Sequence, residues 1–176
     1  MARRDTTAFA EFASARSTAL MRAAYLMVGD ESLAQDLLQE ALTKTYVAWP
    51  RLRDPNAAEA YTRKAITTTA ISWFRRKGWN NERATDRLPD SGSPAQDDVV
   101  ALREWLWDAL QHLPPRQRAA IVLRFYEDLT EAQTADAMGC AVGTVKSQVS
   151  AGIKKLREQL GDDVELLPLN LVVVTP

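Results

Sequence analysis

Apolar residues recur along most of the chain at steps of three and four, which is the spacing of one face of an α-helix. The first run predicts a helix that ends near Gly29. Ser32–Gln35 has the sequence of a capping box and predicts the start of a second helix, which Pro50 ends. Asp54 with the proline after it predicts the start of a third helix, which runs to Lys77. Alternation with a period of two is almost absent, so the pattern predicts an all-α fold.

The helical pattern breaks at residues 87–98, where proline, serine, glycine and aspartate replace the apolar positions. This composition predicts a flexible acidic linker. Beyond it the helical spacing resumes, is interrupted at Pro114–Pro115, and continues in a further helix through Phe125. We therefore expect two small helical bundles joined by the linker and followed by an apolar tail. Their ranges are 1–86, 87–98, 99–161 and 162–176.

A helix-turn-helix pattern lies near the end of the second bundle. Thr130–Gln133 is another capping-box sequence, and Gly139 permits a tight turn into an amphipathic helix at Val142–Leu156. The polar face of that helix is threonine, lysine, serine and glutamine with almost no acid, which suits contact with phosphates and base edges. In a DNA-binding helix-turn-helix, this second helix lies in the major groove. A plain pair of packed helices has the same spacing, so the motif alone leaves both interpretations open.

Composition and charge narrow the class of protein. The chain has 176 residues, of which 46% are hydrophobic and 26% charged, as in an ordinary globular protein. The formal net charge is −1, but basic residues cluster at 63–77 and 146–157, with acidic segments around them. This distribution suits a protein that meets both DNA and a basic protein partner. No apolar run approaches the ~20 residues of a membrane-spanning helix. We also find no signal region and only one cysteine, so we expect a cytoplasmic protein.

No group of residues predicts catalysis. His112 is the only histidine and Cys140 the only cysteine, and they fall in different predicted helices. Neither has a partner for metal binding or nucleophilic chemistry. The acid pairs Asp97–Asp98 and Asp162–Asp163 lie in the linker and the tail, where solvated acids are expected. We therefore expect no cofactor, no metal and no enzymatic activity of its own.

Four stretches, taken in order, resemble a known family. They are AQDLLQEAL (34–42), AISWFRRKG (70–78), LPPRQRAAIVLRFYEDLTEAQTADAMGC (113–140) and VGTVKSQVSAGIKKL (142–156). Their order and residues resemble the extracytoplasmic-function sigma factors of bacterial RNA polymerase. The SWFRR and VGTVKSQ segments are most similar to the actinobacterial sigma-E-type subgroup. The resemblance implies an alternative sigma factor that binds core polymerase, reads the minus-35 promoter element and melts the minus-10 element.

The resemblance also implies a role for each segment. One polar face would dock on the clamp coiled coil of the largest polymerase subunit, and the second bundle on the flap of the second-largest subunit. The implied core-binding residues are Asp36, Gln39 and Glu40. The implied minus-10 DNA residues are Arg51, Asn56, Arg63, Lys64, Thr68, Trp73, Arg75 and Arg76. The implied minus-35 DNA residues are Thr144, Lys146, Ser147, Gln148, Ser150 and Lys154. An anti-sigma factor is a further candidate partner, and a membrane is not.

Alternatives remain open at several points. A stand-alone helix-turn-helix regulator and a pure interaction protein are the rival functions, and the aromatic and basic SWFRR segment disfavours the first of them. For the implied core-binding face, spacing alone favours a solvated acidic surface, and Trp73 fits a plain core position equally well. Thr68, Ala151 and Gln35 stand where relatives usually carry Asn, Arg and Glu. The tail LLPLNLVVVTP (166–176) lies beyond the resemblance, and its apolar composition predicts that it is covered.

Overall fold

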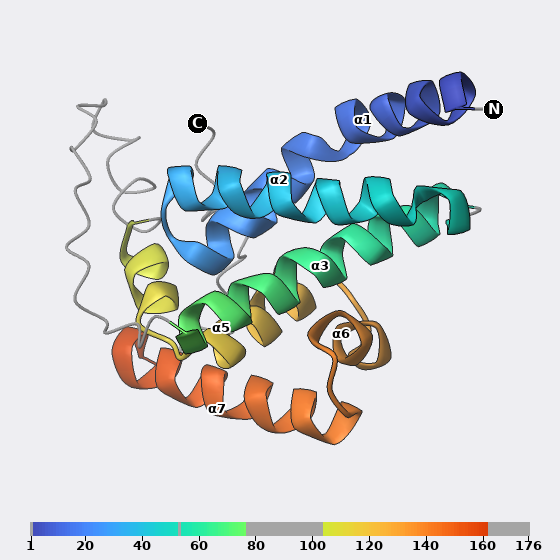
Figure 1. Ribbon diagram of the computed structural model, residues 1–176. Coiled ribbons are helices and arrows are strands. Elements are labelled where there is room, and N and C mark those ends of the chain that lie inside the picture. The colour runs from blue at the N-terminus through green and yellow to red at the C-terminus, as the bar shows by residue number, and fades with distance from the viewer. Residues whose placement is uncertain (1, 53, 77–103, 162–176) are drawn as a thin grey trace.

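The computed structural model describes residues 2–52, 54–76 and 104–161, and every regular element in these ranges is helical (Figure 1). The first half contains α1 (Ala2–Val28), α2 (Glu31–Ala48), the 3-10 turn η1 (Trp49–Arg51) and α3 (Pro55–Arg76). The second half contains a helical segment at 104–111, α5 (Pro115–Ile121), the π-helical turn η2 (Val122–Tyr126), α6 (Glu131–Met138) and α7 (Val142–Leu160). The all-α prediction is confirmed. None of the described helices has the length and apolar character needed to cross a membrane.

The start of α2 differs from the prediction. Asp30, and not Ser32, is the N-cap residue, and its carboxylate accepts a hydrogen bond from the Leu33 amide at 2.8 Å. Gly29 has a φ of 76°, a left-handed conformation that ends α1 and turns the chain sharply. This turn sets Asp30 in an extended conformation over the first turn of α2. The predicted capping box at Ser32–Gln35 is therefore wrong.

Other predicted boundaries are confirmed. Asp54 accepts hydrogen bonds from Asn56 through its side chain and from Ala58 through its carbonyl, each at 3.0 Å, at the start of α3. Thr130 and Gln133 form both bonds of a capping box at α6. Gly139 ends α6 in a left-handed conformation with a φ of 63°. The predicted end of α3 at Lys77–Gly78, the linker 87–98 and the tail 162–176 lie outside the described residues.

The first bundle is built from α1, α2 and α3, which pack on one another along their apolar faces (Figure 1). Leu37 of α2 and Ile66 of α3 are completely or almost completely buried in its centre. The buried hydroxyl groups of Thr45 and Thr62 lie 2.8 Å apart and bridge α2 and α3, so this polar contact is satisfied within the core. These contacts hold α3 between α2 and the second bundle.

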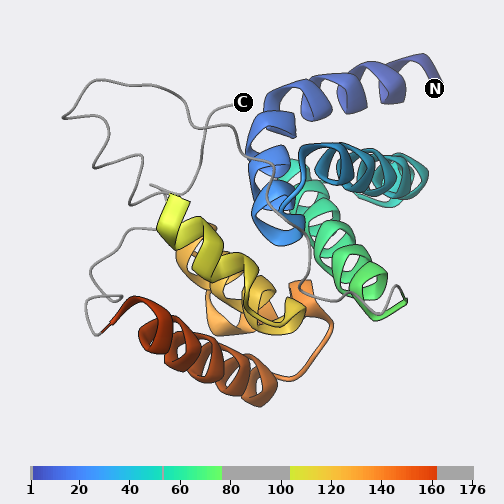
Figure 2. The ribbon, with the colours of Figure 1, turned by 90° about the vertical axis from the view of Figure 1, so that its left-hand side faces the viewer.

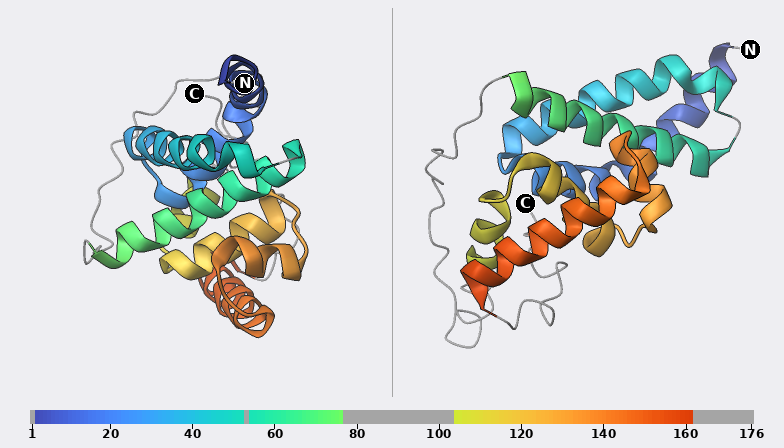
Figure 3. Two further views of the ribbon diagram at one scale, coloured as in Figure 1. Left: turned by 45° about the vertical axis from the view of Figure 1, so that its right-hand side comes forward. Right: turned by 90° about the horizontal axis from the view of Figure 1, so that it is seen from below.

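The second bundle places α7 on the outside of the molecule. Seen from below, α7 lies in front of the other helices, and it is the element farthest from α2 (Figure 3). Its Gly152 lies against α5, where an added Cβ would come within 3.0 Å of Ile121 Cγ1. A residue without a side chain therefore lets the two helices cross closely. Val145 and Leu156 of α7 are buried in this contact region, as the sequence predicted, whereas Val142 is 38% exposed.

The two bundles are in direct contact, which the sequence did not predict. Their buried apolar residues form one continuous cluster, and Figure 2 shows the two halves side by side. The ring of Tyr25 in α1 stacks on Trp107 with 4.5 Å between centroids. Gln111 donates to the Leu26 carbonyl at 3.0 Å. The predicted bundles are present, but a shared apolar core joins them.

Candidate nucleic-acid interface

The polar face of α7 is open to solvent. Lys146, Ser147, Ser150 and Lys154 are exposed, and Thr144 and Gln148 are half-buried. Lys146 lies 3.6 Å from the Glu131 carboxylate, and the two side chains remain 62% and 45% exposed. A long ion pair between solvent-exposed side chains contributes little to stability, so Lys146 remains available to another anion. All six predicted minus-35 residues therefore lie on α7, and four of them are freely accessible.

An open groove lies beside that face. It encloses about 690 Å³ between α7 and η2. Its apolar lining includes Phe125, Val149 and Ile153, and Phe125 is 52% exposed. Cations of Arg124, Lys146, Lys154 and Arg157 line it too, together with Glu131 and Glu158. An apolar floor with a mostly basic margin suits an amphipathic segment of a partner protein.

The exposure of Phe125 follows from η2. The Glu127 amide donates to the Val122 carbonyl at 3.0 Å, a bond that spans five residues where an α-helix spans four. The predicted helix through Phe125 is confirmed, but its last turn is π-helical, and the extra residue changes the helical phase. Asp128, with a φ of 53°, then turns the chain toward α6. We find no signal for this turn in the sequence, because all five of its residues fit a regular helix.

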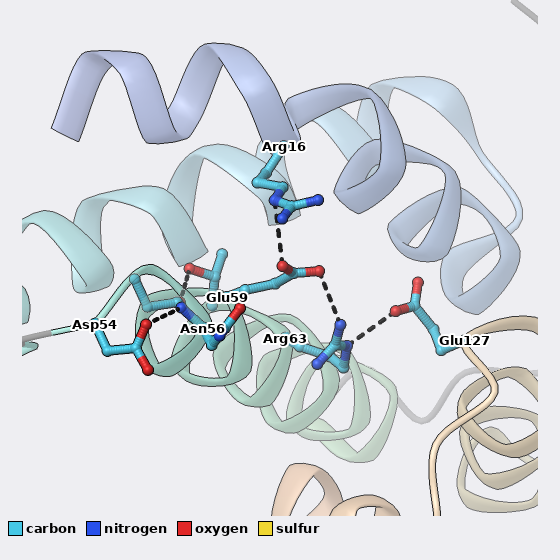
Figure 4. Close-up of polar contacts among 8 residues, drawn as sticks. Arg16, Asp54, Asn56, Glu59, Arg63 and Glu127 are labelled. Atoms are coloured by element: carbon cyan, nitrogen blue, oxygen red, sulfur yellow. Dashed lines mark hydrogen bonds and ion pairs between the residues drawn. The ribbon is translucent and has the colours of Figure 1, made fainter. Parts of the chain in front are cut away.

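The central residues of α3 face the second bundle. Arg63 Nε donates to Glu127 at 2.9 Å, and its terminal nitrogen donates to Glu59 at 3.1 Å (Figure 4). Lys64 binds the Asp136 carboxylate at 3.1 Å. One turn along, the Thr68 methyl lies 3.9 Å from the position that a Cβ on Gly139 would take. Three of the eight predicted minus-10 residues are therefore in contact with, or directly beside, residues of the second bundle.

The other predicted minus-10 residues lie elsewhere on the first bundle. Arg51 and Asn56 are exposed near the start of α3, and Arg75 and Arg76 are exposed at its end. Trp73 is half-buried and packs against the apolar core, the position that the core alternative predicted. The structure thus separates the eight residues into four exposed ones near the ends of α3, three central ones beside the second bundle, and Trp73 against the core.

The predicted core-binding face lies on the surface of α2. Asp36 and Gln39 are exposed, and Glu40 is half-buried. Glu40 already pairs with Lys44 at 2.8 Å, one helical turn away. Because Leu37 and Ala41 on the opposite side of α2 are buried, the face points away from the core. The three side chains are therefore accessible together, and Lys44 partly neutralises the charge of Glu40.

A buried arginine between the bundles was not singled out from the sequence. Arg118 is only 4% exposed and donates to the main-chain carbonyl and side-chain oxygen of Gln111 at 2.9 and 3.1 Å. Its guanidinium lies 4.8 Å from the centre of the Phe74 ring. Burial lowers the pKa of Arg118 to about 10. Arg118 joins the end of α3 to α5, and its place in the LPPRQR segment gives no sequence signal for burial.

The described residues offer no metal site, since no three histidine, cysteine, aspartate or glutamate side chains converge there. His112 is exposed, and its Nδ1 lies 2.6 Å from the Asp108 carbonyl. Cys140 is half-buried beside the Gly139 turn.

The comparisons with known proteins agree with this geometry. The model of Sigma-70 region 2 matches residues 13–80, and that of Sigma-70 region 4 matches residues 103–156. The RNA polymerase sigma-E factor of Streptomyces avermitilis is 38% identical over 160 residues, covering 91% of this chain and 89% of the relative. The protein of the same description from Streptomyces coelicolor is 39% identical over 152 residues, covering 86% and 85%.

More distant relatives also match most of the chain. The ECF RNA polymerase sigma factor SigL of Mycobacterium tuberculosis is 32% identical over 164 residues, covering 82% of this chain and 91% of the relative. Among solved structures, the sigma factor RpoE of Bartonella quintana, in complex with the anti-sigma factor NepR, superposes with a TM-score of 0.67. It is 26% identical and the match covers 88% of this chain and 98% of that one.

Proposed function

Because the chain belongs to the extracytoplasmic-function sigma factors of bacterial RNA polymerase, and so directs promoter-specific transcription initiation, we propose that its surfaces divide promoter recognition between α7 and α3. The polymerase carries out the chemistry in the cytoplasm, and this chain positions and opens the DNA. The observation that carries the proposal is the exposed, acid-poor face of α7, which follows a capped helix and a left-handed glycine turn.

We assign minus-35 recognition to α7. Lys146, Ser147 and Gln148 approach base edges in the major groove, where lysine and glutamine side chains can discriminate bases. Thr144 and Lys154 contact phosphates, and Ser150 extends the polar face between them. The support is geometric, because these side chains share one side of a helix whose other side is buried at Val145 and Leu156.

We assign minus-10 opening to α3 and the turn before it. The exposed Arg51 and Asn56 lie beside the site where a base would leave the duplex, and Arg75 and Arg76 hold the strand about 30 Å away at the other end of the helix. Flipping a base costs a few kcal/mol, and cationic contacts with stacking on an aromatic ring such as Trp73 repay about that amount.

Core polymerase binds through two surfaces in this proposal. Asp36, Gln39 and Glu40 accept hydrogen bonds from arginines of the clamp coiled coil, because carboxylates pair strongly with guanidinium groups. The groove beside Phe125 receives an amphipathic segment of the flap, whose apolar side chains would meet Val149 and Ile153. An anti-sigma factor would compete for the same surfaces.

Transcription with core polymerase on a library of promoter variants tests the proposal. Lys146→Ala should weaken minus-35 binding by roughly 1–3 kcal/mol and relax specificity at one position if the lysine contacts a base. Lys155→Ala is the matched control, since Lys155 is an exposed lysine of the same helix outside the assigned face. If both variants initiate like the unmodified protein, α7 does not read the groove.

Strand opening has a separate test. Changing Arg75 and Arg76 to alanine should reduce open-complex formation more than closed-complex binding, because the two cations act on the separated strand. Permanganate footprinting distinguishes the two complexes. Equal loss of both would mean that these arginines provide general affinity only.

A further inference from the structure

Two acidic residues of the second bundle form ion pairs with the two basic residues in the middle of α3. Glu127 binds Arg63 and Asp136 binds Lys64, from positions 64 and 72 residues further along the chain. Building on the proposed role of α3 in minus-10 opening, we infer that these carboxylates form an autoinhibitory clasp that stands in the place of DNA phosphates. The clasp is defined as Arg63, Lys64, Glu127 and Asp136.

In the Arg63 half of the clasp, carboxylates occupy two of the three guanidinium nitrogens. Its Nε faces Glu127 and its terminal nitrogen faces Glu59, which in turn binds Arg16 of α1 at 3.2 Å (Figure 4). The side chains of Arg63 and Glu127 are only 15% and 12% exposed. Carboxylates and phosphates use the same donors of a guanidinium group. A DNA phosphate that pairs with the Nε of Arg63 must therefore displace Glu127.

The Lys64 half of the clasp is the weaker one. The side chains of Lys64 and Asp136 are 44% and 68% exposed, so water and salt compete with the ion pair between them. Its effect is also steric, because Asp136 belongs to α6, which packs against α3 and leads into the Gly139 turn beside Thr68. The central face of α3 is therefore covered by α6 as well as neutralised by it.

With the clasp in place, the two proposed DNA-binding surfaces differ in how far they are exposed to solvent. The polar face of α7 stays exposed while the central face of α3 is covered. In this arrangement the protein can present its minus-35 surface but not its complete minus-10 surface. Engagement of the minus-10 strand then requires the two bundles to part at α3 and α6.

Binding of a single-stranded minus-10 oligonucleotide to the free, full-length protein tests the clasp. Glu127→Gln with Asp136→Asn removes both charges and should raise oligonucleotide affinity about tenfold, measured by fluorescence anisotropy, a change equivalent to about 1.4 kcal/mol. Glu104→Gln with Asp108→Asn is the control, because it removes two exposed acids of the same bundle that lie outside the clasp. An equal rise in the control, or no rise in the clasp variant, overturns the inference.

A disulfide across the same contact gives the reciprocal test. Thr68→Cys with Gly139→Cys, in a Cys140→Ser background, places two thiols across the contact between α3 and the Gly139 turn. The oxidised protein should form fewer open complexes with core polymerase than the reduced form of the same variant, while minus-35 binding should be equal in the two forms. Comparison of the two redox forms of one variant removes any effect of the substitutions on folding. Full activity in the cross-linked form overturns the clasp.

One further variant separates the clasp from the assignment on which it rests. Arg63→Ala with Lys64→Ala should reduce open-complex formation by the holoenzyme. If it does so while Glu127→Gln with Asp136→Asn leaves oligonucleotide affinity unchanged, the minus-10 assignment stands and the clasp is wrong. If it has no effect on open-complex formation, Arg63 and Lys64 have no role in minus-10 opening, and the clasp that rests on that role is wrong too.

Discussion

The helices α3 and α7 carry similar basic residues but hold them in opposite environments. Arg63 in the middle of α3 is 15% exposed and bound by two carboxylates, whereas Lys146 on α7 is 62% exposed with one distant partner. In the sequence both helices belong to basic clusters. The difference teaches that a cluster of cations marks a possible DNA surface, and that the tertiary neighbours decide whether it is available.

The packing of each helix explains the difference. α3 lies between α2 on one side and α5 and α6 on the other, so even its threonines at 62, 67 and 69 are buried. α7 packs on the second bundle through one side only and leaves its polar side in solvent (Figure 3). A helix covered on two sides can acquire salt-bridge partners from distant segments, and a helix at the margin keeps its charges free.

The largest expected change in the free energy of unfolding comes from removing the aromatic contact between the two bundles. Trp107→Ala should lower the free energy of unfolding by about 3–5 kcal/mol, because Trp107 is 1% exposed and stacks on Tyr25. Trp105→Ala is the matched control, since Trp105 is 46% exposed only two positions away. Urea denaturation measures both. Similar losses for the two variants would contradict the joined core and, with it, the covered position of α3.

A direct comparison of α3 and α7 uses one cation from each. Arg63→Ala should lower the free energy of unfolding by about 1–3 kcal/mol, because it leaves the largely buried Glu127 carboxylate without that partner. Lys146→Ala should change it by less than about 0.5 kcal/mol, as expected for an exposed side chain. Thermal unfolding of the two proteins at equal ionic strength checks the contrast. Equal values would mean that burial of Arg63 has no energetic consequence.

Replacing Arg118, which lies at the same contact between the bundles, should change the free energy of unfolding less. Burial lowers its pKa to about 10, so the protonated form is disfavoured in the native state relative to the unfolded chain. Arg118→Met removes this penalty together with the hydrogen bonds to Gln111, and the two effects should nearly cancel, within about 1 kcal/mol. Chemical denaturation is the measurement. A loss of several kcal/mol would show that the bonds to Gln111 outweigh the cost of burial.

A small effect on the free energy of unfolding is also expected on α2. Reversing the charge at Asp36 and Glu40 should change the free energy of unfolding by less than about 1 kcal/mol, because exposed charges contribute little. The same variant should lose retention on immobilised core polymerase. Charge reversal at Glu104 and Asp108, exposed acids of the second bundle, should leave retention intact. Unchanged retention of the α2 variant would exclude this face as the docking surface.

Local sequence signals predicted most of the fold. The capping box at Thr130, the left-handed turn at Gly139 and the proline start of α5 depend on residues within a few positions of one another. Asp30 was missed because its role depends on the backbone of Gly29, which a capping-box pattern does not include. The family resemblance supplied the candidate residues, and local pattern explains why those on α7 share a face.

Contacts between distant segments account for what the sequence did not predict. The pairing of Arg63 with Glu127 joins residues 64 positions apart and depends on the packing of two bundles. The burial of Arg118 has the same origin, because its neighbour Phe74 belongs to the first bundle. Side-chain type and spacing describe single helices, and neither determines how helices that are distant in the sequence are placed relative to one another.

The π-helical turn η2 has a consequence for the tolerance of this chain to insertions and deletions. Because one residue advances an α-helix by about 100°, deleting a single residue from 122–126 would rotate every later side chain by that angle relative to α5. Glu127 would turn away from Arg63, and a deletion at 122–124 would also turn Phe125 away from the groove. The length of this segment is therefore under stronger constraint than the identity of its residues.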